Sequence, residues 1–170
     1  KAIGDIASRI SKWSKKDDKR LSRLYCYLNS SRAYKMVGHV GDSPDKLELR
    51  LYVDADCCGD SKDTKSTSGG FLVLHGPNTW FPLAWSCKKQ TATSRSTTES
   101  EMVSLAQGLF SEGLPQLSLW ELLLGRPVKL KILEDNQATI TVANKGYSPK
   151  LRHVQRTHKV NLGSVYDVLR

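Results

Sequence analysis

The sequence predicts an α/β fold in which helices flank a mixed sheet, made of an antiparallel meander plus one parallel strand. Three stretches rich in β-forming residues, at 47–54, 71–75 and 79–85, follow one another with turns between them, which is typical of an antiparallel meander. A fourth apolar run, Val128–Leu133, comes after stretches with helical spacing and can pair in parallel with the first strand. The 170 residues suffice for one domain of ordinary size with a buried core and a short extension.

The first strand, residues 47–54, ends in a carboxylate. In LELRLYVD, apolar side chains alternate with polar ones, which is the period of a strand with one face in the core. By parity Asp54 lies on the face opposite the leucines, at the end of the strand, where it can meet a ligand without entering the core. Asp56 and Gly59 follow closely, so an ordinary strand ending in an Asp/Gly turn is the alternative.

Residues 1–46 are expected to form a helical extension, and residues 47–170 the main domain. Up to about residue 34, apolar side chains recur at helical spacing in two runs, and Asp17 and Asp18 can cap the second helix. The extension can be a docking element, the tail of a neighbouring domain, or a helical hairpin packed on the core. Residues 35–46 contain glycines and a proline and read as a linker or a hairpin turn.

A polar, basic segment after residue 85 leads to a helix that carries two acids near its start. Ser96-x-x-Glu99 and Thr98-x-x-Glu101 are both candidate capping boxes for this helix. At about 100° per residue, Glu99 and Glu101 fall on opposite edges of the apolar stripe, so periodicity does not choose which of them reaches a site. Both carboxylates can also simply complement the helix N-terminus.

The second half of the chain again places acids at the end of a strand. Gly113 and Pro115 interrupt the first helix, and a second helical run is predicted over residues 117–125. The fourth strand then runs directly into Glu134 and Asp135. Further helical stretches are predicted at residues 137–145 and from about residue 156 to 170.

The composition favours an intracellular protein that binds nucleic acid. Lys and Arg number 26 against 17 acids, for a formal charge of +9 and a pI near 9.5, which suits a polyanion partner. No apolar run approaches the roughly 20 residues that span a bilayer, and the first residues lack the apolar block of a signal peptide. The four cysteines show no CxxC spacing and are expected to be reduced thiols. We therefore expect no membrane partner and a cytoplasmic or nuclear location.

Asp54, Asp135 and either Glu101 or Glu99 thus stand at the ends of three elements. If the first and fourth strands are neighbours, their C-terminal ends bring Asp54 and Asp135 together, and the helix can add its glutamate. Clustered carboxylates repel one another unless a cation neutralises them, and hard oxygen ligands suit Mg²⁺ or Mn²⁺. Two such ions about 4 Å apart would activate a water and stabilise the leaving oxygen of a phosphodiester.

Five motifs give the sequence a resemblance to a known family. In order they are YVDADCCGD, KSTSGGF, LAWSCKKQ, STTESEMVSL and EDNQA. Together they resemble the ribonuclease H domains of copia-type retrotransposon polyproteins, from about residue 47 onward. The resemblance implies a ribonuclease H-like fold and metal-dependent cleavage of RNA in RNA/DNA hybrids. It makes Asp54, Glu101 and Asp135 the catalytic, metal-holding acids and Glu99 a helix-start residue. The extension looks like the end of the reverse-transcriptase region that precedes such domains.

The chain also departs from the family pattern. The family carries a further strand and a fourth acid beyond the position of the last residue here, so the chain is expected to be truncated at its C-terminus relative to the family. Asp167 is only a distant candidate for that acid, and Asn161 stands where the family usually has Asp. The second hypothesis is therefore a non-catalytic, retroelement-derived nucleic-acid-binding or assembly module. An integrase-type nuclease on the same fold is excluded, because no Glu follows Glu134.

Basic and amide side chains near the acids are expected to contact an RNA/DNA hybrid. The candidates are Lys88, Lys89, Arg95, Asn136, Gln137, Arg152 and Arg156. Phosphate contacts make affinity fall steeply with salt, whereas a merely solvated basic face is the alternative. His153 and His158 lack a cysteine at zinc-ligand spacing and are expected to be structural or to contact phosphate. The rest of a reverse-transcriptase polyprotein, or a larger complex, is a further expected partner.

Overall fold

The computed structural model describes residues 2–59 and 64–170. Contacts divide the chain into two compact units, Lys1–Val37 and Gly38–Arg170. Residues 60–63, which follow the Asp/Gly turn after the first strand, lie outside the described residues. Within the described part of the chain, no helix combines the length and the apolar character needed to cross a membrane.

The first unit is helical, as predicted. It contains α1 (Ala2–Ala7), a short 3₁₀ turn η1 (Ile10–Lys12) and α2 (Lys15–Ser31). Ser14 and Asp17 form a capping box at the start of α2, in which the backbone N–H of Ser14 donates to the Asp17 carboxylate at 3.1 Å. This reciprocal capping satisfies backbone groups that a helix start otherwise leaves without partners.

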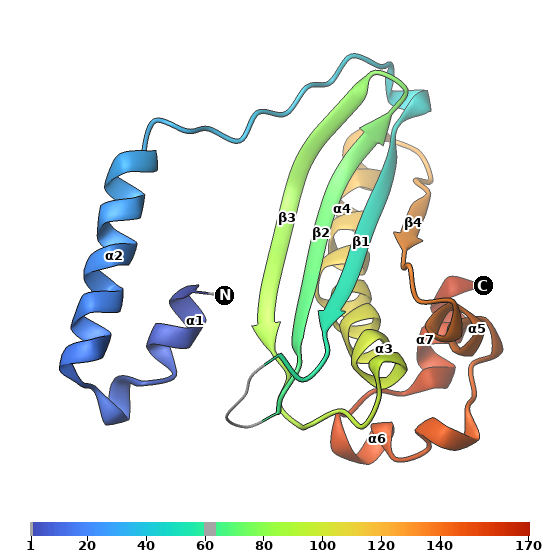
Figure 1. The fold of residues 1–170 in the computed structure, drawn as a ribbon. Coiled ribbons are helices and arrows are strands. Elements are labelled where there is room, and N and C mark those ends of the chain that lie inside the picture. Colours follow the sequence, from blue (N-terminus) through green and yellow to red (C-terminus); the bar gives the residue numbers. More distant parts are fainter. Residues whose placement is uncertain (1, 60–63) are drawn as a thin grey trace. The chain divides into compact units, whose positions relative to one another are not determined.

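The second unit is built on a four-stranded sheet with the order β3-β2-β1-β4 (Figure 1). Its strands are β1 (Glu48–Asp56), β2 (Thr67–Gly76), β3 (Thr79–Lys89) and β4 (Leu130–Leu133). β1 to β3 form an antiparallel meander, and β4 pairs in parallel with β1. The sequence prediction of a mixed sheet flanked by helices is confirmed, and the arrangement is consistent with a ribonuclease H-like fold.

The segment before β1 belongs to this second unit. The backbones of His39 and Trp80 exchange hydrogen bonds of 2.8 and 2.9 Å, so the segment adds a short bridge to β3. A 3₁₀ turn, η2 (Pro44–Lys46), then leads into β1. Arg126 donates from Nη2 to the Leu47 carbonyl oxygen at 2.7 Å, which ties this entry point to the loop before β4.

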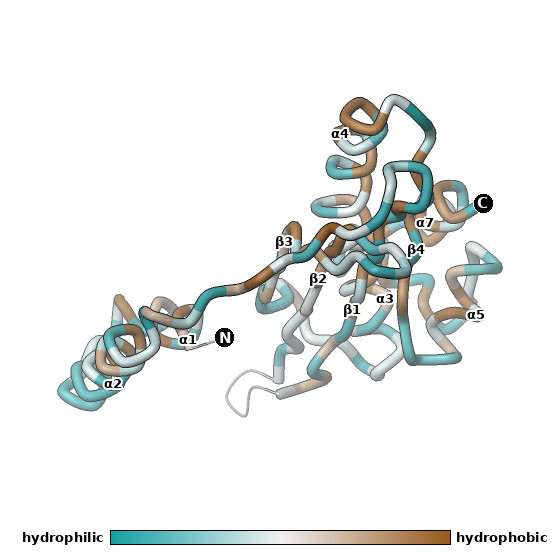
Figure 2. Tube along the Cα trace, turned by 90° about the horizontal axis from the view of Figure 1, so that it is seen from above, coloured by the Kyte–Doolittle hydropathy of each residue, from teal (hydrophilic) through white to brown (hydrophobic). Residues whose placement is uncertain are grey.

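A long helical stretch covers one face of the sheet (Figure 1). It consists of α3 (Thr97–Gly108), the π-helical turn η3 (Leu109–Gly113) and α4 (Leu114–Leu124), which ends at Gly125 in the left-handed conformation. Figure 2 shows the apolar character of α4 in brown, and some of its leucines stay in solvent; Leu122 is 80% exposed.

The predicted interruption at Gly113 and Pro115 is wrong, because the chain remains helical through both residues. The backbone N–H of Leu114 donates to the carbonyl oxygen of Leu109, five residues earlier. This wider turn shifts the hydrogen-bond register just before Pro115, which lies in the first turn of α4, where a missing N–H is tolerated.

The core lies between the sheet and α3. Leu49 and Leu51 of β1 are fully buried, as their parity predicts, and pack with Met102 and Leu105 of α3. The helix and the strand approach closely at Gly108, since a Cβ atom there would come within 2.8 Å of Val53 Cγ1. The helix therefore sits directly on the strand that carries Asp54.

Four short helical elements complete the chain. They are α5 (Gln137–Lys145), η4 (Pro149–Leu151), α6 (Val154–Thr157) and α7 (Leu162–Leu169). The helix predicted from about residue 156 to the end is thus divided. Lys159 adopts a positive φ of 62°, which a continuous right-handed helix does not allow, and Asn161 starts a new helix by accepting from the Ser164 N–H at 3.2 Å.

Candidate active site

Glu101 is a carboxylate held inside the protein near the start of α3. Glu101 is only 5% exposed to solvent. Burial, followed by the negative charges of Glu134, Asp54 and Asp135, raises the pKa of the Glu101 carboxyl to about 7. Charges act on a carboxyl pKa from within its neighbourhood, so Asp54, Asp135 and Glu134 lie in the surroundings of Glu101.

Two neighbouring strands bring the aspartates to this place. The last residue pair of the parallel ladder between β1 and β4 is Tyr52 with Leu133. Asp54 and Asp135 each lie two residues beyond that pair, at the same end of the sheet. Asp54 is exposed on the face opposite the buried leucines, as parity predicts.

Ser104 fastens the helix to the strand that carries Asp54. Its hydroxyl donates to the Asp54 carbonyl oxygen at 2.7 Å and lies 3.1 Å from the carbonyl oxygen of Gly69 on β2. A helix residue one turn after Glu101 is therefore bonded to the backbone of the first predicted acid. Nothing in the sequence pattern indicates this contact, because Ser104 reads as an ordinary polar residue.

Glu134 is a fourth acid in the cluster, to which the sequence assigned no role. Burial raises the pKa of the Glu134 carboxyl, the charges of Asp135 and Asp54 raise it further, and the Asn136 N–H opposes them. That N–H donates to Glu134 Oε1 at 2.9 Å. The only sequence signal for Glu134 is its position beside Asp135 at the end of the fourth strand.

The donor set fits the cation that the sequence predicts. Glu101 Oε2 and Glu134 Oε2 are buried and have no hydrogen-bond partner. Carboxylate oxygens are the ligands that Mg²⁺ and Mn²⁺ prefer, and a cation would satisfy oxygens that no protein donor reaches. Across residues 2–59 and 64–170, however, no three His, Cys, Asp or Glu side chains stand close enough to hold a metal ion without moving.

Glu99 has a different environment from Glu101. Its Oε1 lies 3.0 Å from His153 Nε2 and 3.2 Å from His158 Nε2, and its Oε2 accepts the Arg95 N–H at 2.9 Å. The Glu99 carboxylate thus connects the start of α3 to the C-terminal segment, whereas the charges of the other acids act on Glu101. Periodicity could not separate the two glutamates, and the histidines that do so are more than 50 residues away in the sequence.

The predicted nucleic-acid contacts occupy several elements. Lys88 and Lys89 are exposed at the end of β3, and Arg95 is exposed just before α3. Gln90, between them, is buried, and its side-chain amide donates to the Ser100 carbonyl oxygen at 2.9 Å. The basic segment is therefore anchored to the helix that carries Glu101.

The later candidates surround α5 and α6. Asn136 caps α5, since its side-chain oxygen accepts the Thr139 N–H at 3.0 Å. Gln137 is exposed in the first turn of that helix, and Arg156 is exposed on α6. Their contact with nucleic acid stays a prediction.

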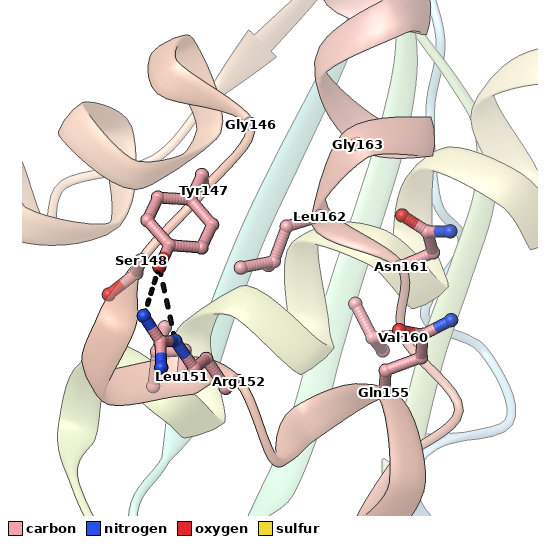
Figure 3. A pocket seen from close by; sticks show the side chains of 10 residues that line it. All are labelled: Gly146, Tyr147, Ser148, Leu151, Arg152, Gln155, Val160, Asn161, Leu162 and Gly163. Atoms are coloured by element: carbon pink, nitrogen blue, oxygen red, sulfur yellow. Dashed lines mark hydrogen bonds between the residues drawn. The ribbon is translucent and has the colours of Figure 1, made fainter.

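Arg152 lines a cavity of about 320 Å³ between the end of α5 and the start of α7 (Figure 3). Its Nε and Nη2 atoms donate to the Tyr147 hydroxyl at 3.1 and 2.6 Å. Leu162 and Val160 lie on other walls of this cavity. The tyrosine thus orients the Arg152 guanidinium.

Comparisons with known proteins point to a mobile genetic element. Retrovirus-related Pol polyproteins from the transposons RE2 and RE1 of Arabidopsis thaliana are each 45% identical to this chain over 86 residues. The match covers 51% of this chain but only 5% of each polyprotein. A secreted RxLR effector protein of Plasmopara viticola is 33% identical over 87 residues, covering 51% of this chain and 56% of that protein.

No family model and no solved structure matches the chain. The homologous Pol polyproteins support a retrotransposon polyprotein origin for this α/β domain. Since the chain spans a small part of their length, the activities of those proteins do not transfer to it directly.

Proposed function

We propose that this chain is a ribonuclease H module that hydrolyses the RNA strand of RNA/DNA hybrids during the reverse transcription of a retroelement. Two observations support the proposal most strongly: Asp54 and Asp135 follow neighbouring parallel strands at the same end of the sheet, and the charges of both raise the pKa of Glu101 on the helix packed there. Such a group of carboxylates has little structural use, because its members repel one another.

The three acids would hold two divalent cations, Mg²⁺ or Mn²⁺. When bound, such cations activate a water and stabilise the leaving oxygen of the scissile phosphodiester. The protein positions the acids through rigid elements: the ladder between β1 and β4 sets Asp54 and Asp135, and Ser104 holds α3 against β1. Glu99 stabilises the start of the helix and lies outside the catalytic group.

Basic and amide side chains would contact the backbone of the hybrid. The proposed set is Lys88, Lys89, Arg95, Asn136, Gln137, Arg152 and Arg156. Selectivity for a hybrid would come from groove shape and ribose 2′-hydroxyls rather than from base edges. Residues 1–46 would be the end of a reverse-transcriptase region, so that the module acts within a polyprotein or a larger complex in the cytoplasm or nucleus.

The test is cleavage of a labelled RNA/DNA hybrid in Mg²⁺ or Mn²⁺. We expect cleavage of the RNA strand by the purified chain, and a loss of at least about 100-fold in Asp135→Asn. Asp45→Asn removes the same charge from the exposed turn η2, at the opposite end of β1 from Asp54, and is expected to keep the wild-type rate. Equal rates in wild type and Asp135→Asn would reveal a contaminating nuclease and contradict the proposal.

One observation favours the second candidate, a non-catalytic nucleic-acid-binding or assembly module. Within the described residues, no three potential ligands are already arranged around a common point. If the chain binds the hybrid with strong salt dependence but does not cleave it in either cation, the binding module is the correct function.

A further inference from the structure

Two buried carboxylate oxygens in the candidate active site have no partner. Glu101 Oε2 and Glu134 Oε2 accept no hydrogen bond, and Glu101 as a whole is only 5% exposed to solvent. Leaving a buried polar atom unsatisfied destabilises a fold, so such atoms in native proteins call for an explanation. One explanation is a ligand that both oxygens share.

Glu134 is oriented toward this role by its surroundings. Its Oε1 accepts the Asn136 N–H at 2.9 Å, while Asn136 itself caps α5, so one side of the Glu134 carboxylate is fixed by the start of that helix. The remaining oxygen, Oε2, stays buried and unsatisfied.

The neighbouring charges identify the chemical class of the ligand. Among the charges acting on Glu101, that of Glu134 is the strongest, ahead of Asp54 and Asp135. Four carboxylates gathered in this way have no use for an anion or an apolar group. They suit a hard divalent cation, which takes oxygen ligands and keeps some of its water.

We propose that Glu134 is a further ligand of the divalent cation that the proposed function assigns to Asp54, Glu101 and Asp135. The inference rests on that proposed function. Glu134 would supply a fourth carboxylate from within the described chain, next to Asp135. In the family resemblance, the fourth acid has no match in this sequence. These side chains would have to move toward a common point to hold the cation, because no three potential ligands among the described residues are grouped around one as they stand.

The experiment measures Mn²⁺ binding to the full chain by the electron paramagnetic resonance signal of free Mn²⁺, with no nucleic acid present. Glu134→Gln keeps the size of the side chain and removes one negative charge, and Glu134→Asp keeps the charge but shortens the side chain. Asp45→Asn, in the exposed turn η2, is the matched control for the loss of one negative charge far from the cluster along β1. Thermal unfolding without Mn²⁺ verifies that each variant is folded.

We expect Glu134→Gln to weaken Mn²⁺ binding at least about tenfold, Glu134→Asp to weaken it less, and Asp45→Asn to leave it unchanged. Equal affinities in Glu134→Gln and Asp45→Asn would overturn the inference. If Asp135→Asn still abolishes Mn²⁺ binding and hybrid cleavage in that case, the proposed function survives and only the role of Glu134 falls. A wild-type chain that neither binds Mn²⁺ nor cleaves the hybrid would overturn both.

Discussion

The side chains of Glu101 and Glu134, which come from α3 and from the end of β4, each bury one unsatisfied carboxylate oxygen in the same cluster of acids. The charge of Glu134 acts on Glu101 more strongly than that of either aspartate. A bound cation would compensate this repulsion between carboxylates. Without a cation, the repulsion should destabilise the folded chain.

Glu101→Gln is expected to make the chain more stable at pH 8 in the absence of divalent cations. The Glu101 pKa rises from 4.5 to about 7 on folding, so the folded state binds more protons than the unfolded chain between these values. The free energy of unfolding therefore falls as the pH rises through this window, by at most about 3 kcal/mol.

Urea unfolding of wild type and Glu101→Gln from pH 4.5 to 8 measures the effect. Other groups titrate in both proteins, so the difference between the two curves isolates Glu101. The difference should grow with pH in favour of the variant. A constant difference across this range would mean that Glu101 titrates normally.

Ser104→Ala is expected to destabilise the chain by about 1–2 kcal/mol. The hydroxyl bonds to the Asp54 carbonyl oxygen at 2.7 Å and lies close to that of Gly69, so its removal leaves buried backbone acceptors with fewer donors. Ser118→Ala is the matched control, because Ser118 is a helix serine on α4 whose hydroxyl bond is long, at 3.4 Å, and exposed. Urea unfolding should show a clear loss for the first variant and almost none for the second.

The position of Asp54 could be predicted from the sequence because it depends only on the local pleat. Alternation along residues 47–54 places Leu49 and Leu51 in the core and Asp54 outside it, and the structure agrees. The choice between Glu99 and Glu101 could not be predicted in this way. Both flank the apolar stripe, and only distant residues, His153 for one and Asp54 for the other, distinguish their surroundings.

The error at Pro115 has a similar origin. Helix propensity describes a regular α-helix, in which an interior proline removes a hydrogen bond and clashes with the preceding turn. The π turn at Leu109–Gly113 changes that register, and it follows directly on the close contact of Gly108 with β1. Tertiary packing therefore decides whether the helix continues through Pro115, and the sequence pattern alone does not show this packing.

Gly108→Ala is expected to destabilise the chain by about 1 kcal/mol or more, although alanine favours a helix. The new Cβ atom would meet Val53 Cγ1 at 2.8 Å, and a β-branched side chain in a strand has little freedom to move. In the Val53→Ala background the obstructing methyl group is absent. There the same substitution should become neutral or stabilising, and urea unfolding of the four proteins completes the double-mutant cycle. A cost that is equal in both backgrounds would mean that the contact with Val53 is not its cause.

Arg156→Gln is expected to weaken binding of an RNA/DNA hybrid and to make it less sensitive to salt. If Arg156 contacts one phosphate, the slope of log K against log salt should fall in magnitude by about 0.9. Lys129→Gln is the control, since Lys129 is exposed before β4, at the opposite end of that strand from Asp135. Fluorescence anisotropy at several salt concentrations, in EDTA to prevent cleavage, gives both slopes. Identical slopes for the two variants would remove Arg156 from the interface.

Glu99→Gln is expected to destabilise the chain, opposite in sign to Glu101→Gln only two residues away. The Glu99 carboxylate, 1% exposed, accepts the Arg95 N–H at 2.9 Å and lies 3.0 Å from His153 Nε2, and weakening these buried contacts should cost about 2 kcal/mol. His153 comes from the segment around α6, so hydrogen exchange should become faster there while β1 stays protected. If both glutamine variants change stability in the same direction at pH 8, the two glutamates do not have the separate surroundings described above.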